Sequence, residues 1–228
     1  MRPAWVHGED FEFPAPERAT REGVVAIGGD VTPATLRRAY GRGIFPWPIR
    51  ADLPMFWFSP NPRFILDFND FHVPRSLMKI VRRGDFEVRF DTALDDVMEG
   101  CATVRRGESG TWIHPRLRAA FSELGAEPPT QGISVHSVEA WRGGALVGGL
   151  YGVQVGASFA GESMFFREPE ASKVALVVLV ERLVERGFHF VDCQVATQNL
   201  ARFGAKEVPR SNFLHRLELA SSDSSATF

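Results

Sequence analysis

Residues 145–194 read ALVGGLYGVQVGASFAGESMFFREPEASKVALVVLVERLVERGFHFVDCQ, and the spacing of apolar residues in this stretch decides the fold. Side chains of a strand alternate between two faces, whereas one face of a helix recurs about every 3.6 residues. These two periods predict strands over 145–153, 158–166 and 188–194, with a helix over about 171–186 between the last two. The residues expected to form the buried stripe of that helix are Leu176, Leu179, Val180, Leu183 and Val184.

The flanking residues extend this pattern. Residues 134–141 alternate as a strand, and the pair Gly143 and Gly144 predicts a hairpin turn. Further on, 197–203 predict a short helix that ends at Gly204, and 213–219 a last strand. The order strand–strand–strand–helix–strand–helix–strand resembles the acetyltransferase-like (GNAT) fold, a mixed sheet with helices packed on it. We therefore expect an α+β protein, although a shared fold does not indicate a function.

The first part of the chain has a different composition. Thr32 is placed to cap a helix that begins at Pro33 and ends at Gly41 and Gly43. Residues 44–60 are rich in aromatic residues and prolines, which argue against a central strand or a long helix. We expect a small irregular N-terminal domain over 1–62, followed by the GNAT-like domain over 63–228.

The net charge and the cysteine pattern argue against a nucleic-acid-binding surface over the whole protein and against a metal-binding protein. The chain has 228 residues, a formal net charge of −2 and two cysteines, so nucleic-acid contacts have to come from a local patch. Cys101, Cys193 and the six histidines show no metal-ligand spacing. Residues 1–25 lack the apolar stretch of a signal peptide, and the longest aliphatic run is too short to cross a bilayer. We expect a cytoplasmic protein with no metal and no membrane contact.

Residues 72–83, HVPRSLMKIVRR, provide a candidate patch. Arg75, Lys79, Arg82 and Arg83 fall on one face of a helix, and no acidic residue lies among them. A solvated amphipathic face is the ordinary alternative. The absence of interleaved acids favours a stripe that binds phosphates.

Polar residues near the ends of two apolar strands are the candidates for catalysis. Asp192 and Gln194 are expected on one face of a strand, and Glu162 lies near the end of another. A carboxylate beside an amide can position and deprotonate an amine. The alternative is that each acid accepts backbone hydrogen bonds or caps a helix. Cys193 follows Asp192, which disfavours a thiolate.

Nine strings lie in order between about Phe13 and Leu217: AIGGDVTPATLRRAYGRGIFPWP, FSPNPRFIL, TWI, HSVEAW, LVGGLYGV, GESMFFR, ASKVAL, VDCQ and FGAKEVPRSNFL. Together they are similar to the leucyl/phenylalanyl-tRNA–protein transferases. That resemblance implies a bacterial enzyme that moves Leu, Phe or Met from aminoacyl-tRNA to an N-terminal Arg or Lys of a protein, which creates an N-degron. It implies no cofactor, because the tRNA ester is already activated.

The resemblance also implies roles for particular residues. Asp192 and Gln194 are placed at the reaction centre, and it stays open which of them takes the amine proton. Glu162 is expected to orient the amine or to hold Gln194. Trp47 and Trp112 match the tryptophans near the terminal adenosine, and the basic face of 72–83 matches the helix that meets the acceptor stem. The donor side chain is expected to lie among Leu150, Phe159, Met164, Leu176, Leu179, Leu183 and Val191.

The chain departs from the family pattern at a few positions. Leu179 and Leu183 stand where Phe is expected, Phe121 where Tyr is expected, and Phe166 where Ser is expected. A small change in an apolar pocket shifts selectivity by about 1–3 kcal/mol. These departures affect the choice among donor amino acids rather than the reaction class.

Two other functions fit the same residues. One is an acyltransferase of this fold that uses CoA or builds a peptide bridge from aminoacyl-tRNA. Residues 166–172, FREPEAS, contain no glycine to cradle a diphosphate, which disfavours CoA. The other is a non-catalytic module that binds tRNA or protein. The sequence shows no pattern that indicates an oligomer, and we expect a monomer.

Overall fold

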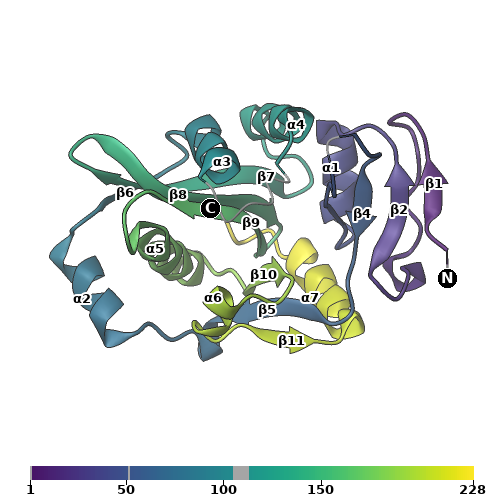
Figure 1. The fold of residues 1–228 in the computed structure, drawn as a ribbon. Coiled ribbons are helices and arrows are strands. Elements are labelled where there is room, and N and C mark those ends of the chain that lie inside the picture. Colours follow the sequence, from purple (N-terminus) through teal and green to yellow (C-terminus); the bar gives the residue numbers. More distant parts are fainter. Residues whose placement is uncertain (1, 51, 105–112) are drawn as a thin grey trace.

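The computed structural model describes residues 2–50, 52–104 and 113–228. Within them the chain forms two β-sheets, one from the N-terminal segment and a larger one from the rest (Figure 1). The larger sheet is mixed, because β10 (Phe190–Gln194) is parallel to β9 (Ser158–Phe166) and the other neighbours are antiparallel. The predicted α+β class and mixed sheet are confirmed. In spatial order its strands are β11 (Lys206–Val208), β5 (Arg63–Asp67), β10 (Phe190–Gln194), β9 (Ser158–Phe166), β8 (Ala145–Val155), β7 (Ile133–Arg142) and β6 (Glu87–Phe90).

Helices cover both faces of the larger sheet (Figure 1). α3 (Leu94–Thr103) and α4 (Pro115–Ala126) pack on one face of β7–β9, and α5 (Ala171–Glu185) packs on the other. Adjacent glycines of β8 allow both approaches: a Cβ on Gly148 would meet Ala171 of α5, and one on Gly149 would meet Val97 of α3. The helices are α1 (Pro33–Tyr40), α2 (Arg75–Arg83), α3 (Leu94–Thr103), α4 (Pro115–Ala126), α5 (Ala171–Glu185), α6 (Gln198–Ala201) and α7 (Arg210–Ser222), with 3-10 turns at Pro16–Arg18 and Phe68–Asp70. None of these helices combines the length and apolar composition of a membrane span.

Most of the predicted helices are confirmed, including the ends given by local signals. The Thr32 side chain accepts a hydrogen bond from the Thr35 backbone N–H at 3.2 Å, and the Thr35 hydroxyl oxygen accepts one from the Thr32 backbone N–H at 2.8 Å, so α1 begins with a capping box. α5 buries Leu176, Leu179, Val180 and Leu183 as predicted. Val184 does not belong to this stripe, since it is 52% exposed.

The prediction for the N-terminal segment was wrong in one respect. The segment forms a four-stranded sheet in the order β1 (Ala4–Val6), β2 (Val24–Gly28), β4 (Phe56–Phe58) and β3 (Phe45–Pro46). β4 is a central strand although it lies in the proline-rich stretch. Its residues carry no proline, so their backbone N–H groups are available for pairing. Trp57 in this strand is fully buried and donates to the Gly28 carbonyl at 2.9 Å.

The last predicted strand was also wrong. Residues 213–219 lie within α7, which follows Pro209. The buried residues of α7 are Phe213, Leu217 and Ala220, spaced by four and three residues, which is a helical face. The apolar residues of this segment fit the period of a strand as well as that of a helix, and burial in the tertiary structure selects the helix.

Two β-bulges interrupt neighbouring strands of the larger sheet. On β9, Gly161 and Ser163 pair with Gly152 and Tyr151, which leaves Glu162 as the extra residue. On β10, Asp192 and Gln194 pair with Ile65 and Phe64, which leaves Cys193 as the extra residue. A bulge redirects side chains relative to a regular strand. The expectation that Asp192 and Gln194 lie on one face of a regular strand therefore does not hold.

Gly152, opposite the first bulge, should not tolerate a side chain. A Cβ there would lie 2.3 Å from the Ala160 carbonyl oxygen and 2.5 Å from the Phe159 ring. We expect Gly152→Ala to lower the free energy of unfolding by about 1–3 kcal/mol in urea denaturation. Its pairing partner is the control, because a Cβ on Gly161 meets nothing closer than 3.9 Å. Equal losses for both variants would contradict this account of the bulge.

Candidate active site

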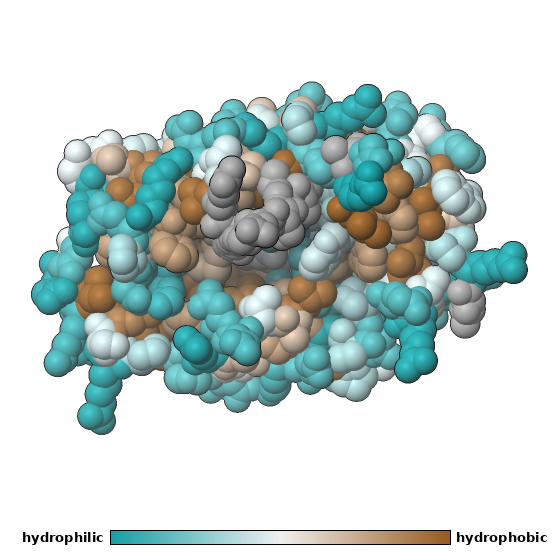
Figure 2. Space-filling view, in the orientation of Figure 1, coloured by the Kyte–Doolittle hydropathy of each residue, from teal (hydrophilic) through white to brown (hydrophobic). Residues whose placement is uncertain are grey.

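A cavity of about 490 Å³ lies beside the two bulges and is lined mainly by apolar side chains from β3, β8, β9 and α5. Figure 2 shows apolar surface in the middle of this face within a largely hydrophilic rim. Six of the seven residues predicted for the donor pocket line the cavity: Leu150, Phe159, Met164, Leu176, Leu179 and Val191. The seventh, Leu183, is fully buried but is not among the lining residues.

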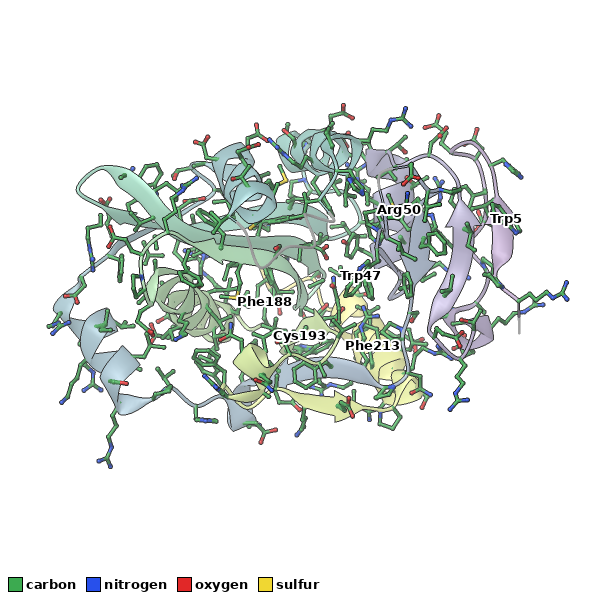
Figure 3. The ribbon with its side chains drawn as sticks, in the orientation of Figure 1. Trp5, Trp47, Arg50, Phe188, Cys193 and Phe213 are labelled. Atoms are coloured by element: carbon green, nitrogen blue, oxygen red, sulfur yellow. The ribbon has the colours of Figure 1, made fainter. Side chains whose placement is uncertain are left out.

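Aromatic residues of the N-terminal segment complete the wall. Phe45 and Trp47 line the cavity, with their ring centroids 5.9 Å apart, and Figure 3 shows Trp47 between α5 and the N-terminal sheet. Sequence reasoning did not single out Phe45. Trp112, the other tryptophan predicted at the adenosine site, lies outside the described residues.

Glu162 and Gln194 are among the polar residues that line the cavity. The Gln194 amide nitrogen donates to Glu162 Oε1 at 2.5 Å. Gln194 has a φ of 63°, in the left-handed region that non-glycine residues rarely adopt. The structure therefore brings together two of the three predicted catalytic residues at the cavity surface. The amide nitrogen of Gln194 is used on Glu162, so its carbonyl oxygen is the end that can accept an N–H from a ligand.

Asp192, the third predicted catalytic residue, is not among the residues that line the cavity. Its carboxylate accepts two hydrogen bonds from Arg63, at 2.8 Å from Nε and 2.6 Å from a terminal nitrogen. Both side chains are buried, with 2% and 6% exposure. Sequence reasoning missed Arg63, although it lies in the string FSPNPRFIL.

Burial dominates the electrostatics of Glu162. Loss of solvent raises the pKa of this carboxyl to about 7, and the negative charge of Asp192 adds to the rise. The Tyr40 hydroxyl, Gln194 and Arg63 act in the opposite direction. Near neutral pH the group can therefore both hold and release a proton.

Two buried tyrosines, Tyr40 and Tyr151, stand close to Glu162. Among the described residues, the buried hydroxyls of Tyr40 and Tyr151 and Glu162 Oε2 form no hydrogen bond of normal geometry. Burial and the charge of Glu162 raise the pKa of both tyrosines. Phe121 packs between them, with ring centroids 6.2 Å from Tyr40 and 5.5 Å from Tyr151. The position where Tyr was expected thus lies in this same polar niche.

Two other sequence-based expectations concern single residues near the cavity. Burial and the adjacent Asp192 raise the pKa of the Cys193 thiol, so a nucleophilic thiolate is disfavoured as predicted. Phe166, where Ser was expected, lines the cavity and is 52% exposed.

The predicted basic helix is α2, and its four basic side chains, Arg75, Lys79, Arg82 and Arg83, are exposed. Arg83 donates to Asp85. A second cavity of about 330 Å³ lies between α2 and the start of α5. It shares Lys173 and Asn199 with the main cavity, so the basic helix and the main cavity are connected along the surface.

The buried Glu162 should make stability depend on pH. Its pKa is about 7 in the folded chain against 4.5 for an ordinary glutamate. The folded state thus binds more protons between these values, and the free energy of unfolding falls as pH rises through them, by up to about 1.4 kcal/mol per unit. Glu162→Gln removes this dependence, so we expect its stability relative to the wild type to increase from pH 4.5 to pH 8.

Urea denaturation at several pH values would measure this effect. The exposed Glu181 on α5 is the control, and Glu181→Gln should show no such trend. A stability difference for Glu162→Gln that stays constant with pH would argue against a raised pKa.

Comparison with known proteins identifies relatives over most of the chain. Residues 65–218 match the family described as leucyl/phenylalanyl-tRNA protein transferase, and residues 29–61 match its N-terminal domain. A leucyl/phenylalanyl-tRNA–protein transferase of Nitratidesulfovibrio vulgaris is 54% identical over 203 residues, covering 89% of this chain and 84% of that protein. One of Myxococcus xanthus is 51% identical over 209 residues, covering 91% and 87%.

Likeness to solved structures is much weaker. A GCN5-related N-acetyltransferase from Kribbella flavida aligns with a TM-score of 0.39 and 9% identity, covering 80% of this chain and 63% of that one. Such a score carries no argument about the reaction.

Proposed function

Because the chain belongs to the leucyl/phenylalanyl-tRNA protein transferase family, we propose that it transfers leucine, phenylalanine or methionine from aminoacyl-tRNA to an N-terminal Arg or Lys of a protein. The product would carry a new N-terminal residue that acts as an N-degron. The observation that carries this proposal is a mainly apolar cavity of about 490 Å³ whose lining includes Glu162 and Gln194. Such a cavity suits an apolar donor side chain whose ester carbonyl lies near these two residues.

In the proposed reaction, the acceptor amine nitrogen attacks the ester carbonyl carbon. A C–N bond forms and the C–O bond to the tRNA ribose breaks, so that the electron pair of that bond stays on the ribose oxygen. The amine proton finally resides on this oxygen. The ester is already activated, and the proposal requires no cofactor.

Glu162 and Gln194 have different roles in this proposal. A neutral carboxamide is a very weak base, so Gln194 orients the amine through its carbonyl oxygen. Glu162, with a pKa near 7, takes the proton from the amine and returns it to the leaving oxygen. Holding amine and carbonyl together supplies much of the rate.

The tRNA would contact both cavities. Trp47, and Trp112 beyond the described residues, are proposed to stack on the terminal adenosine. The exposed basic residues Arg75, Lys79, Arg82 and Arg83 of α2 are proposed to contact acceptor-stem phosphates. The second cavity lies between these sites and offers a path for the single-stranded end.

Domain organisation, location and oligomeric state are also proposals. We place the boundary between 1–62 and 63–228, where the N-terminal sheet ends and β5 begins. A substrate such as aminoacyl-tRNA favours the cytoplasm, and a monomer suffices because the residues assigned above come from one chain.

A transfer assay tests the function directly. Purified protein is mixed with radiolabelled Leu-tRNA or Phe-tRNA and with peptides that differ only in their first residue. We expect label on Arg- and Lys-initiated peptides and none on Ala-initiated ones. Glu162→Gln and Gln194→Ala should each lower the rate about 100-fold while donor binding persists. Bound tRNA without any transfer by the wild type would instead favour a non-catalytic binding module.

Leu179 should influence the choice of donor, because it lines the cavity. Leu179→Phe adds volume there and should lower Phe transfer relative to Leu transfer by about 10-fold or more. Leu183, one helical turn away and outside the lining, is the control. The ratio of the kcat/KM values for the two donors should stay unchanged in Leu183→Phe. An equal shift in both variants would contradict this assignment of the pocket wall.

A further inference from the structure

Arg63 is the most completely enclosed charged side chain near the site. It lies at the start of β5 and is 1% exposed. A guanidinium in such surroundings requires partners for its charge and for its N–H groups. Arg63 carries no role in the reaction proposed above, although it stands beside the catalytic residues.

The partners of Arg63 come from three parts of the chain. Its Nε and one terminal nitrogen bind the two oxygens of Asp192, at 2.8 and 2.6 Å, and the other terminal nitrogen donates to the Gly43 carbonyl at 3.2 Å. The guanidinium carbon lies 4.7 Å from the centre of the Phe45 ring and 4.3 Å from that of Phe213. The group is therefore fixed in plane and in position.

Asp192 passes this constraint to Gln194. Its Oδ1 accepts the backbone N–H of Gln194 at 3.0 Å, across the bulge at Cys193. That hydrogen bond supports the left-handed conformation of Gln194, whose φ is 63°. From this backbone the Gln194 amide reaches Glu162. Arg63 thus stands at the start of a chain of contacts that ends at the reacting amine.

The contacts also define what Asp192 does. Both of its oxygens accept hydrogen bonds from Arg63, and Oδ1 accepts a second one from Gln194. The carboxylate does not line the cavity and faces a fixed cation. Its oxygens are used within the protein, so it is poorly placed to take a proton from a substrate.

We infer that Arg63 is a positioning residue for aminoacyl transfer: through Asp192 it holds the bulge that aims Gln194 at Glu162 and the acceptor amine. The inference rests on the proposed function. It assigns Asp192 to the same supporting role rather than to proton transfer. Because Gly43 and Phe45 flank Arg63, it also ties the N-terminal wall of the cavity to the catalytic bulge.

Arg63→Lys tests the inference, since it keeps the charge but loses the two-pronged contact. We expect kcat for peptide transfer to fall by about 100-fold, the scale of a small misplacement of reacting groups. KM for aminoacyl-tRNA should stay within about twofold, because Arg63 is not itself a lining residue of the cavity. Circular dichroism would confirm that the variant is folded.

The chain offers a matched control in Arg216 of α7. Arg216 contacts both oxygens of Asp67 and lies 4.8 Å from the Phe190 ring centre, which repeats the arrangement of Arg63 away from the cavity. Arg216→Lys should lower thermal stability and leave kcat unchanged. A similar fall of kcat in both variants would mean a general structural effect and would overturn the inference.

A double-variant cycle separates positioning from proton transfer. Arg63→Lys and Asp192→Asn break the same link, so the double variant should lose no more than about threefold beyond the worse single variant. Losses that multiply would show that Asp192 acts on the substrate independently of Arg63. That result would overturn the role assigned to Arg63 and Asp192.

Phe213→Leu provides a variant that keeps every charge. Phe213 packs on the guanidinium and is not among the cavity-lining residues. We expect kcat to fall by about fivefold, since one of two ring contacts is lost.

If Arg63→Lys does not fold, an unchanged kcat for folded Phe213→Leu and Asp192→Asn overturns the inference. An inactive wild type overturns the proposed function itself, whereas an active wild type with a fully active Arg63→Lys overturns this inference alone.

Discussion

The buried ion pair between Arg63 and Asp192 is the interaction on which the site depends. It joins two neighbouring strands, β5 and β10, whose residues are 129 positions apart in the chain. Removing both charges from water is costly, and the geometry offsets this cost with two hydrogen bonds and two aromatic rings. Loss of one partner alone would leave a buried charge, at a cost of about 3–5 kcal/mol. The ion pair therefore stabilises the fold only when both residues are present.

The two bulges explain how a regular sheet presents irregular polar groups. Glu162 and Cys193 are the extra residues in strands that lie side by side. The bulges bring Glu162 and Gln194 into contact at the end of an apolar cavity. Burial disfavours the charged form of the Glu162 carboxyl and thereby raises its pKa to about 7. The same burial of Glu162 therefore lowers stability at neutral pH and enables its carboxyl to exchange a proton.

The charged residues of the site differ in solvent exposure according to their distance from the cavity. The exposed arginines and lysine of α2 stay in solvent, where they can contact phosphates without loss of hydration. Beside the cavity, Arg63 and Asp192 are paired and buried, and the wall itself is mainly apolar. Phe121 extends that apolar character, because its ring packs between those of Tyr40 and Tyr151.

The sequence by itself determined the elements that depend on short-range signals: the capped α1, the β7–β8 hairpin, α5 and the exposed basic face of α2. Its motifs also indicated the family, Glu162 and Gln194, and most of the apolar wall. Tertiary structure alone decided that 213–219 are helical, that β4 is central, that Leu183 lies outside the cavity lining, and that Asp192 binds Arg63. Caps and periodicity act between near neighbours, and the sequence reports them directly. The partner of a buried charge and the register of a bulge depend on strands that are distant in the chain, and only packing brings them together.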